Sequence, residues 1–329
     1  MKAIRIAGTG SYLPEKVLSN FDLEEMVDTS DEWIRRRTGI SERRLARPDQ
    51  AASDLGQKAA FQALAQAKME PKDLDLLIMA TITPDTCCPS GANWLENKIG
   101  ASNAVSFDVT AACCGFLFGI SVAEHYLRVG TFENAMVVAA EVMSRTVNWQ
   151  DRSSSILWGD GAGALILDTQ SSNGGEVIST ILHTDGSRGE NLLMPGGGSR
   201  TTPISHESVD RGVHYLQLVE APTTFKVAVE HFTMACEEAL EVNGLSADQI
   251  SLYIPHQANI RIMQAMAKKL GVSMDRIFVN IDRYGNISSA SMAIGLDEAN
   301  HQGRIKKGDL VLLCGFGGGL TWGSSLIRW

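Results

Sequence analysis

Three polar side chains of the types that act together in acyl transfer each follow a predicted strand. Cys113 lies between the strand predicted near 104–110 and the helix predicted near 114–129. The unpaired N–H groups and the dipole at the start of a helix favour a negative sulfur there. His256 and Asn286 lie at two further strand ends, each before a helical segment. Because catalysis in α/β sheets gathers at the carboxyl ends of strands, the sequence predicts a thiolate nucleophile with two polar partners.

Each of these residues also has a structural interpretation. Free cysteines are among the most often buried residue types, and Cys114 and Cys236 fit a packing role better than Cys113 does. A single histidine is more often a core residue, and a single asparagine is more often a turn residue. The occurrence of all three types at matching turns favours the functional interpretation.

A glycine run near the C-terminus, 317–319, follows another buried strand. Backbone N–H groups in such a turn can donate to a developing oxyanion without a side chain in the way. Glycine-rich phosphate loops look similar, but this run lacks the Gly-Lys-Ser/Thr ending and does not open a helix. Gly161 and Gly163 precede a strand. The sequence therefore favours an oxyanion site over a nucleotide site.

Short aliphatic runs alternate with amphipathic stretches over the first 170 residues, which is typical of an α/β fold around a buried sheet. Two polar, glycine-rich stretches, 171–175 and 186–200, are expected to be loops or a lid. The expected strands lie near 2–9, 75–83, 104–110, 135–142 and 162–168, and the expected helices lie near 51–69, 90–99 and 114–129.

The second half of the chain repeats the pattern of the first. A helix, a polar turn and a strand at 63–78 match 239–254 at a shift of 176 residues, which sets Ala63 against Ala239. The next strand ends match at a shift of 173, which sets Cys113 against Asn286. We therefore expect two similar halves whose strand ends meet at one crevice. The expected units are 1–170 with the nucleophile, connecting loops at 171–211, and 212–329 with the histidine and asparagine.

Composition excludes several classes of protein. The 29 Lys and Arg against 38 Asp and Glu give a net charge of −9, so nucleic-acid binding would need a local basic patch. The apolar runs are far shorter than the roughly 18 to 20 residues of a membrane span, and the first residues lack the pattern of a signal peptide. The six cysteines contain no C-x-x-C spacing. We expect a cytoplasmic protein with free thiols, without a metal or other cofactor, a membrane span or a nucleic-acid partner.

At these same residues the chain resembles the β-ketoacyl-acyl carrier protein synthase III enzymes of the thiolase-like fold. The resemblance covers essentially the whole chain and implies two βαβαβαββ halves packed as a five-layered αβαβα sandwich. Its motifs are Thr29-Ser-Asp-Glu-Trp-Ile with Arg37-Thr-Gly-Ile, Asp108-Val-Thr-Ala-Ala-Cys-Cys-Gly-Phe, Gly159-Asp-Gly-Ala-Gly-Ala, Pro255-His-Gln-Ala-Asn, Tyr284-Gly-Asn-Ile-Ser-Ser-Ala-Ser and Phe316-Gly-Gly-Gly-Leu-Thr-Trp-Gly-Ser.

The resemblance implies a role for each motif. Cys113 would carry the acyl group, His256 and Asn286 would assist decarboxylation, and the N–H groups of Cys113 and Gly318 would form the oxyanion hole. The implied reaction joins an acyl-CoA primer, acetyl-CoA first among the candidates, to malonyl-acyl carrier protein, and it starts fatty acid synthesis. A homodimer is also implied. The implied coenzyme A contacts are Trp33 and Arg152 around the adenine and Arg37 near the phosphates.

Two further expectations concern partners. Taken alone, four basic residues would be an ordinary solvated face, but the same positions carry carrier-protein docking in the family: Lys226, Arg261, Lys268 and Lys269. The loop 86–89 would reach the partner subunit's acyl pocket, where Cys88 replaces the phenylalanine of some relatives, so that primers longer than acetyl could fit. Ala221 and Pro222 depart from the family pattern along the pantetheine channel.

Three alternative functions remain open from the sequence. A condensing enzyme of secondary metabolism with a longer primer would use the same residues. Cysteine, histidine and asparagine also serve thioester hydrolases and thiol proteases, in which water releases the acyl group. A catalytically silent binding protein is disfavoured because all three residues are present.

Overall fold

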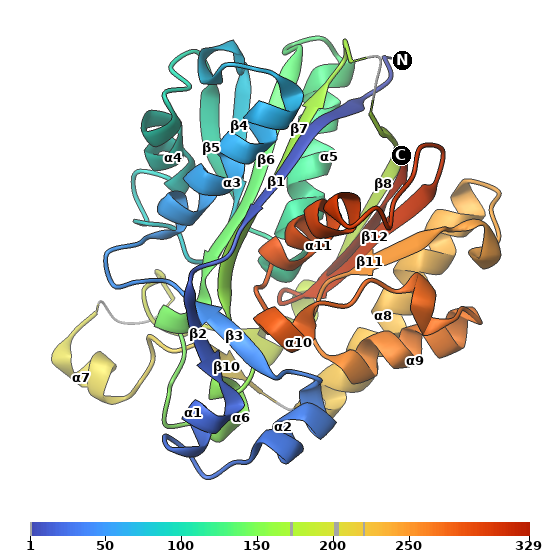
Figure 1. The fold of residues 1–329 in the computed structure, drawn as a ribbon. Coiled ribbons are helices and arrows are strands. Elements are labelled where there is room, and N and C mark those ends of the chain that lie inside the picture. The colour runs from blue at the N-terminus through green and yellow to red at the C-terminus, as the bar shows by residue number, and fades with distance from the viewer. Residues whose placement is uncertain (1, 172–173, 201–203, 220) are drawn as a thin grey trace.

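A computed structural model describes residues 2–171, 174–200, 204–219 and 221–329, with the backbone alone at 221–224. In its N-terminal half, five strands lie side by side in the order β5-β4-β6-β7-β1 (Figure 1). The strands are β1 (Arg5–Tyr12), β4 (Leu76–Ala80), β5 (Val105–Val109), β6 (Asn134–Val142) and β7 (Asp160–Asp168). The helices that pack on them are α3 (Ala52–Ala67), α4 (Gly91–Ile99) and α5 (Gly115–Arg128).

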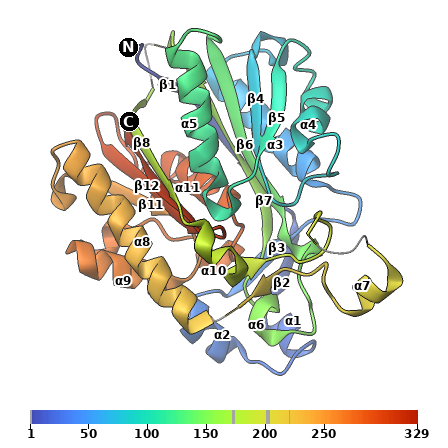
Figure 2. The same ribbon diagram turned by 180° about the vertical axis from the view of Figure 1, so that it is seen from behind.

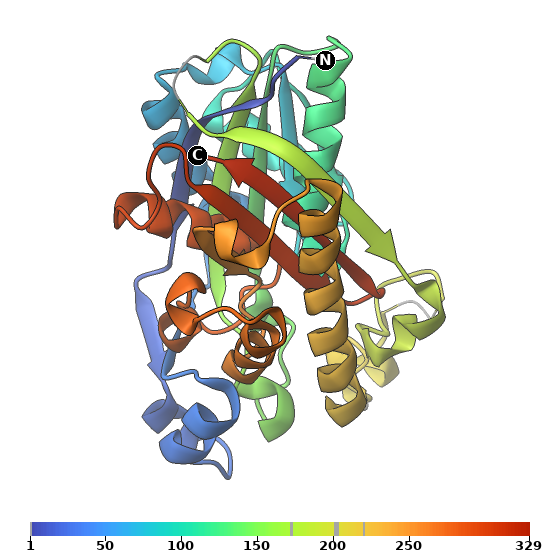
Figure 3. The ribbon, with the colours of Figure 1, turned by 90° about the vertical axis from the view of Figure 1, so that its right-hand side faces the viewer.

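The C-terminal half repeats this order with one strand fewer, β11-β12-β13-β8. Its strands are β8 (Glu176–Thr184), β11 (Leu252–Pro255), β12 (Leu310–Gly317) and β13 (Thr321–Arg328). Its helices are α8 (Ala221–Val242), α9 (Ile260–Leu270) and α11 (Ala290–His301), and Figure 3 shows α8 across the strands of this half. A pairing of Arg5 with Glu176 joins β1 to β8, so the two halves share one nine-stranded sheet.

Three buried clusters define the layers. One lies between the sheet of the N-terminal half and α3 and α4, and another lies between the strands of the C-terminal half and α8 and α9. The third contains α5 and α11, which pack between the two groups of strands (Figures 1 and 2). This arrangement confirms the predicted thiolase-like αβαβα sandwich of two similar halves.

Small residues bring β1 and α3 unusually close together. A Cβ atom at Gly8 would lie 2.3 Å from the Ala63 carbonyl oxygen, and one at Gly10 would lie 2.3 Å from that of Ala59. The alanines recur at helical spacing on the buried face of α3. Glycine is therefore required on this strand face by close packing rather than by a turn.

The predicted elements agree with the structure to within a few residues over the first 170. The stretch 171–211, expected to be connecting loops, also contains β8. The position of β5 in the first half is taken in the second by residues 277–280, which pair with β11 through a single bridge between Tyr253 and Ile277. Gln257 Oε1 accepts hydrogen bonds from the N–H groups of Asn280 and Ile281 and turns this segment into α10 (Ile281–Tyr284).

The remaining short elements form a lobe at one end of the sheet and a protruding segment beside it (Figure 1). The lobe contains β2 (Lys16–Ser19), α1 (Asn20–Glu24), α2 (Asp31–Thr38), β3 (Glu42–Leu45) and α6 (Arg152–Ser155). The protruding segment contains α7 (His206–Asp210), and the pair of β9 (Leu192–Leu193) with β10 (Gln217–Leu218) connects it to the rest of the molecule. No described helix has both the length and the apolar character needed to cross a bilayer.

Candidate active site

Cys113 lies in a tight turn between β5 and α5, as the sequence predicts. Ala112 adopts a left-handed conformation with φ of 46°, which is uncommon for a residue with a side chain. The Cys114 N–H donates to the Ala111 carbonyl oxygen at 3.1 Å and closes the turn. Cys113 is 4% exposed and precedes the first residue of α5 by two positions. The turn therefore holds the thiol at the positive end of a 14-residue helix.

His256 follows β11 directly and is 1% exposed. Its N–H donates to the Cys314 carbonyl oxygen at 2.8 Å, which fixes its backbone beside β12. Burial lowers the pKa of the imidazole to about 3, against a smaller opposing effect of the Ser288 backbone. The ring is therefore neutral at physiological pH and can act as a hydrogen-bond donor but not as a cation.

Asn286 follows α10 and a glycine, Gly285, with φ of 67°. Its backbone bridges to the segment before β7: its N–H donates to the Leu157 carbonyl oxygen at 2.8 Å, and its own carbonyl oxygen accepts from the Gly159 N–H at 3.0 Å. Its side-chain Oδ1 accepts from the Ser288 N–H at 2.9 Å. The amide oxygen is thus occupied, and the Nδ2 group is the atom that can donate to a substrate oxygen.

Ser288 brings the three predicted residues together. Its N–H binds the side chain of Asn286, its backbone interacts with the imidazole of His256, and its hydroxyl interacts with the thiol of Cys113. Sequence analysis did not single out this serine. It lies two residues after Asn286 in a predicted turn, and serine is a common turn residue, so its type and position alone do not indicate a function.

Low polarity around Cys113 keeps its thiol protonated in the free protein. Burial raises the pKa of Cys113 to about 12, and the negative charge of Glu141 adds to the increase. The hydroxyl of Ser288 acts in the opposite direction and lowers this pKa. A group that approaches the sulfur can therefore raise or lower the pKa of the thiol, according to its charge and its hydrogen bonding.

The glycine turn between β12 and β13 packs against Cys113. A Cβ atom at Gly317 would lie 2.7 Å from the backbone nitrogen of Cys113, so only glycine allows this approach. Thr321 Oγ1 donates to the Ala111 carbonyl oxygen at 3.1 Å and ties the start of β13 to the turn before Cys113. Gly318 follows in the same turn, and its carbonyl oxygen accepts from Thr321 Oγ1 at 3.3 Å. Its role as an oxyanion donor stays a prediction.

Glu141 is a buried carboxylate that sequence analysis missed. It is fully buried at the end of β6 and accepts hydrogen bonds from the hydroxyls of Thr81, Thr83 and Ser289 at 2.6 to 3.1 Å. Burial raises its pKa. The contacts tie the loop after β4 to the start of α11. A charged residue within the apolar run 135–142 was the signal that could have identified it.

The predicted coenzyme A residues lie in the lobe at the end of the sheet. Trp33 is on α2, and the guanidinium carbons of Arg152 and Arg37 lie 5.0 and 5.4 Å from the centroid of its indole ring. Both arginines are exposed. The three side chains form one cation–π cluster. An adenine ring bound between Arg152 and Trp33 would have to displace the guanidinium from the indole ring.

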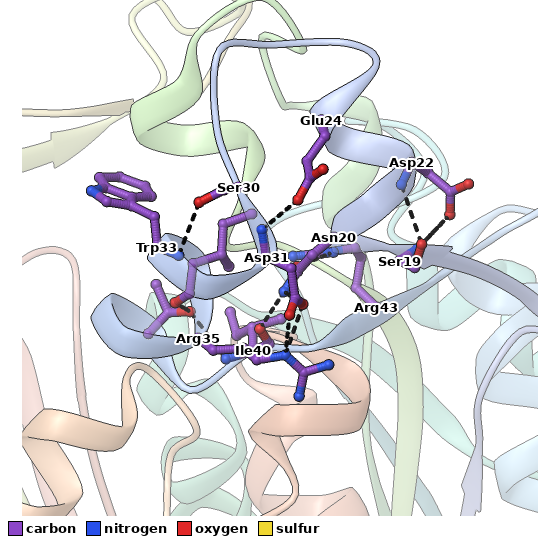
Figure 4. Close-up of polar contacts among 12 residues, drawn as sticks. Ser19, Asn20, Asp22, Glu24, Ser30, Asp31, Trp33, Arg35, Ile40 and Arg43 are labelled. Atoms are coloured by element: carbon purple, nitrogen blue, oxygen red, sulfur yellow. Dashed lines mark hydrogen bonds and ion pairs between the residues drawn. The ribbon is translucent and has the colours of Figure 1, made fainter.

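A polar network inside this lobe includes Asn20, Asp31 and Arg43 (Figure 4). Arg43 is fully buried and donates to Asn20 Oδ1 at 3.0 Å and to the Ile156 carbonyl oxygen at 2.8 Å. Asn20 Nδ2 donates in turn to Asp31 Oδ1 at 2.9 Å, at the start of α2. Burial lowers the pKa of Arg43 to about 10. A Cβ atom at Gly285 would lie 3.4 Å from Arg43 Cβ, so the arginine also packs beside the turn that carries Asn286.

The predicted partner-facing residues are exposed. Cys88 and its neighbour Cys87 lie on the surface in the loop before α4. The four basic residues lie on two adjacent helices, α8 and α9, and the Arg261 guanidinium packs 5.4 Å from the centroid of the Phe225 ring. The side chains of Ala221 and Pro222 lie outside the described residues, so their effect on the channel stays a prediction. The four docking candidates are Lys226, Arg261, Lys268 and Lys269.

Comparison with known proteins matches two family models. Residues 107–186 match the model of 3-oxoacyl-[acyl-carrier-protein (ACP)] synthase III, and residues 240–329 match the model of its C-terminal part. A β-ketoacyl-[acyl-carrier-protein] synthase III of Caldanaerobacter subterraneus is 49% identical over 99% of this chain and 98% of its own length. The chain belongs to the 3-oxoacyl-[acyl-carrier-protein] synthase III family.

Solved structures of synthase III enzymes agree with this assignment. The enzyme of Aquifex aeolicus superimposes with a TM-score of 0.90 at 41% identity, over 99% of this chain and all of the other. That of Pseudomonas aeruginosa gives a TM-score of 0.91 at 35% identity over 100% and 98%. A priming β-ketosynthase of the R1128 polyketide pathway is also similar, with a TM-score of 0.90 at 33% identity over 99% and 96%. The chain is thus a condensing enzyme of the acyltransferase class.

Proposed function

We propose that this synthase III joins an acyl-CoA primer, with acetyl-CoA first among the candidates, to malonyl-acyl carrier protein. The product is a 3-oxoacyl-acyl carrier protein that starts fatty acid synthesis in the cytoplasm. The observation that carries the proposal is the convergence of a buried thiol, a neutral imidazole and an oriented amide on Ser288. These groups supply the nucleophile and the two donors that the reaction needs.

In the first half-reaction, the sulfur of Cys113 attacks the thioester carbon of acyl-CoA. The N–H groups of Cys113 and Gly318 hold the tetrahedral oxyanion, and coenzyme A leaves as the acyl-enzyme forms. Because one thioester is exchanged for another, positioning matters more than driving force. The packing of Gly317 against the Cys113 nitrogen supports this role of the turn.

In the second half-reaction, malonyl-acyl carrier protein loses carbon dioxide and becomes an enolate. The neutral imidazole of His256 and the Nδ2 group of Asn286 donate hydrogen bonds to the thioester oxygen as negative charge accumulates there. The carbanion then attacks the acyl group on Cys113. Loss of carbon dioxide generates the carbanion, so the reaction needs neither a strong base nor a cofactor.

The two substrates bind at different places: acyl-CoA at the lobe, and the carrier protein at helices α8 and α9. Trp33 and Arg152 hold the adenine of coenzyme A, and Arg37 lies near its phosphates. The acidic carrier protein docks on the basic residues of α8 and α9, which are exposed on a chain of net charge −9. We infer no nucleic-acid partner, because this basic group is small and local.

The functional unit is a homodimer. Strand β5 is the edge of the nine-stranded sheet, and Val105 at its start is 53% exposed. An exposed edge strand offers unpaired backbone groups to a second copy. Pairing of β5 with its symmetry mate would bring the loop that carries Cys88 to the partner's acyl pocket, where its small side chain leaves room for primers longer than acetyl.

One experiment separates this function from the alternatives. Intact mass is measured after addition of acetyl-CoA and again after malonyl-acyl carrier protein, with Cys113→Ala as the control. An acetyl adduct that disappears as a 3-oxoacyl product forms supports condensation. Slow loss of the adduct to water without that product would favour a hydrolase, and a wild-type protein without any adduct would contradict both. Comparison of acetyl-, butyryl- and octanoyl-CoA measures the primer range.

A further inference from the structure

The hydroxyl of Ser288 is buried near enough to the Cys113 thiol to lower its pKa, yet it forms no hydrogen bond of good geometry with any described residue. Its neighbours in the same turn are satisfied: Ser289 Oγ lies 3.0 Å from both the Ala80 carbonyl oxygen and Glu141 Oε1, and Ser291 Oγ accepts from the Ile287 N–H at 3.2 Å. Buried polar groups are nearly always paired, so an unpaired hydroxyl beside a nucleophile calls for a functional explanation.

The backbone at Ser288 is strained in the same way as the backbone at the nucleophile. Ser288 has φ of 45°, and Ala112, directly before Cys113, has φ of 46°. Left-handed conformations are unfavourable for residues with a Cβ atom and concentrate at functional sites. Two such residues from the two halves of the chain therefore set the relative positions of the Ser288 hydroxyl and the thiol.

The surroundings of the thiol lack a positive side chain within the described part of the chain. The imidazole of His256 is neutral, Cys114 is a second buried thiol, and Glu141 opposes ionisation of Cys113. Among the described residues, the groups that favour a negative sulfur are the start of α5, the backbone of Cys113 itself and the hydroxyl of Ser288.

We propose that Ser288 is a further catalytic residue. Its hydroxyl donates a hydrogen bond to the sulfur of Cys113 as the thiolate forms and attacks the thioester. This inference rests on the proposed function for the identity of the attacked substrate. The neutral thiol leaves the hydroxyl unpaired, whereas the thiolate is a strong acceptor. The interaction is therefore stronger in the transition state than in the ground state, which is the requirement for catalysis.

The step is balanced without a further reagent. The S–H bond of Cys113 breaks, and its proton is taken up by the departing thiolate of coenzyme A. A bond forms between the Cys113 sulfur and the acyl carbon, and the bond between that carbon and the coenzyme A sulfur breaks. Ser288 keeps its own proton throughout, because it acts only as a hydrogen-bond donor.

The test measures the rate at which iodoacetamide alkylates Cys113, by peptide mass spectrometry that separates it from the exposed Cys87 and Cys88. We expect Ser288→Ala to slow alkylation about 10- to 100-fold at pH 7.5, as for loss of one hydrogen bond to a charged group. Because burial keeps this thiol mostly protonated, the rate should rise about tenfold per pH unit between pH 7 and 9, and the variant should stay slower than wild type by the same factor throughout. Ser291→Ala, which removes a neighbouring buried hydroxyl, should react at the wild-type rate.

Ser288→Gly separates the hydroxyl from the backbone, because glycine suits the left-handed conformation and folds even where alanine does not. Equal slowing in the glycine and alanine variants supports the proposal. A wild-type alkylation profile in Ser288→Gly overturns it. Alkylation needs neither coenzyme A nor a carrier protein, so a wild-type protein that forms no acetyl adduct would contradict the proposed function while leaving the serine result intact.

Discussion

Two regions of the molecule meet opposite physical requirements. They are the turns that carry the proposed catalytic residues, named the catalytic turns below, and the lobe that carries the proposed coenzyme A residues. At the catalytic turns, Cys113, His256 and Asn286 are each less than 7% exposed, and the imidazole is neutral. In the lobe, by contrast, two exposed arginines pack on the Trp33 ring. A buried site of neutral dipoles stabilises charge that appears only during reaction, whereas an exposed cationic site attracts a ligand that is already charged. Substitutions should therefore change turnover in the first region and affinity in the second.

The largest expected effect is at the two donors of the catalytic turns. Replacement of His256 or Asn286 by alanine should slow decarboxylation of malonyl-acyl carrier protein by about 100- to 1000-fold, because each removes one donor to the developing enolate. Acetylation of Cys113 by acetyl-CoA should change much less, because that step uses backbone donors. Rapid-quench measurement of the two half-reactions checks the difference, and equal losses in both steps would show that the residues serve the site as a whole.

The neutral state of His256 can be tested through the pH dependence of stability. The pKa of His256 is about 3 in the folded protein and near 6.5 in the unfolded chain, so between these values only the unfolded chain binds the proton. Stability from this group is therefore present above pH 6.5 and is lost as pH falls toward 3, by about 1.4 kcal/mol per pH unit.

The matched variant is His256→Gln, which carries no titrating group at this position. The difference in free energy of unfolding between wild type and this variant, from urea titrations at pH 4.5 to 7.5, should follow the stated slope. A difference that does not depend on pH would mean that the imidazole is solvated and has an unshifted pKa. The contrast between a buried neutral site and an exposed charged site would then no longer hold for His256.

Arg43 lies between the two regions and should affect both. In Arg43→Lys, one ammonium group replaces a planar fork that binds Asn20 and the Ile156 carbonyl oxygen. We expect a loss of stability of about 1 to 3 kcal/mol from the groups left unpaired and a several-fold higher KM for acetyl-CoA, through displacement of α2. Trp33→Ala, which removes a direct contact, should raise that KM without the loss of stability.

Differential scanning calorimetry and initial-rate kinetics on the same preparations separate these outcomes. If Arg43→Lys unfolds at a lower temperature with an unchanged KM for acetyl-CoA, the arginine stabilises the lobe without positioning Trp33. The network in Figure 4 would then be structural only.

The sequence could predict where the proposed catalytic residues lie, because residue type and position at a strand end can both be read from it. Cys113 and Asn286 match across the internal repeat, and the structure has both at the equivalent turns. Ser288, Glu141 and Arg43 could not be predicted in this way, because their importance comes from neighbours that are distant in sequence. Thr81 and Ser289, for example, meet on Glu141 only after both halves have folded.

The repeat was likewise informative about topology but not about its local exceptions. The segment after Ile277 has the apolar residues of a strand. The N–H groups of Asn280 and Ile281, however, donate to Gln257 Oε1, and the chain turns there into α10. Asn286 reaches the site because of this bend. The boundaries of the proposed units, 1–170, 171–211 and 212–329, stay a prediction.

The smallest expected effect concerns carrier-protein docking, because the docking candidates on α8 and α9 are exposed to solvent. Exposed ion pairs contribute about 0.2 to 1 kcal/mol each, so Lys268→Glu with Lys269→Glu should raise KM for malonyl-acyl carrier protein roughly fivefold. The increase should shrink at high salt, where charge repulsion is screened, and KM for acetyl-CoA should stay unchanged. A second exposed pair, Lys306 and Lys307, precedes the start of β12 and provides the matched control. Because both double variants change the net charge by the same amount, an equal rise in both would show that overall charge, rather than docking on α9, governs the encounter.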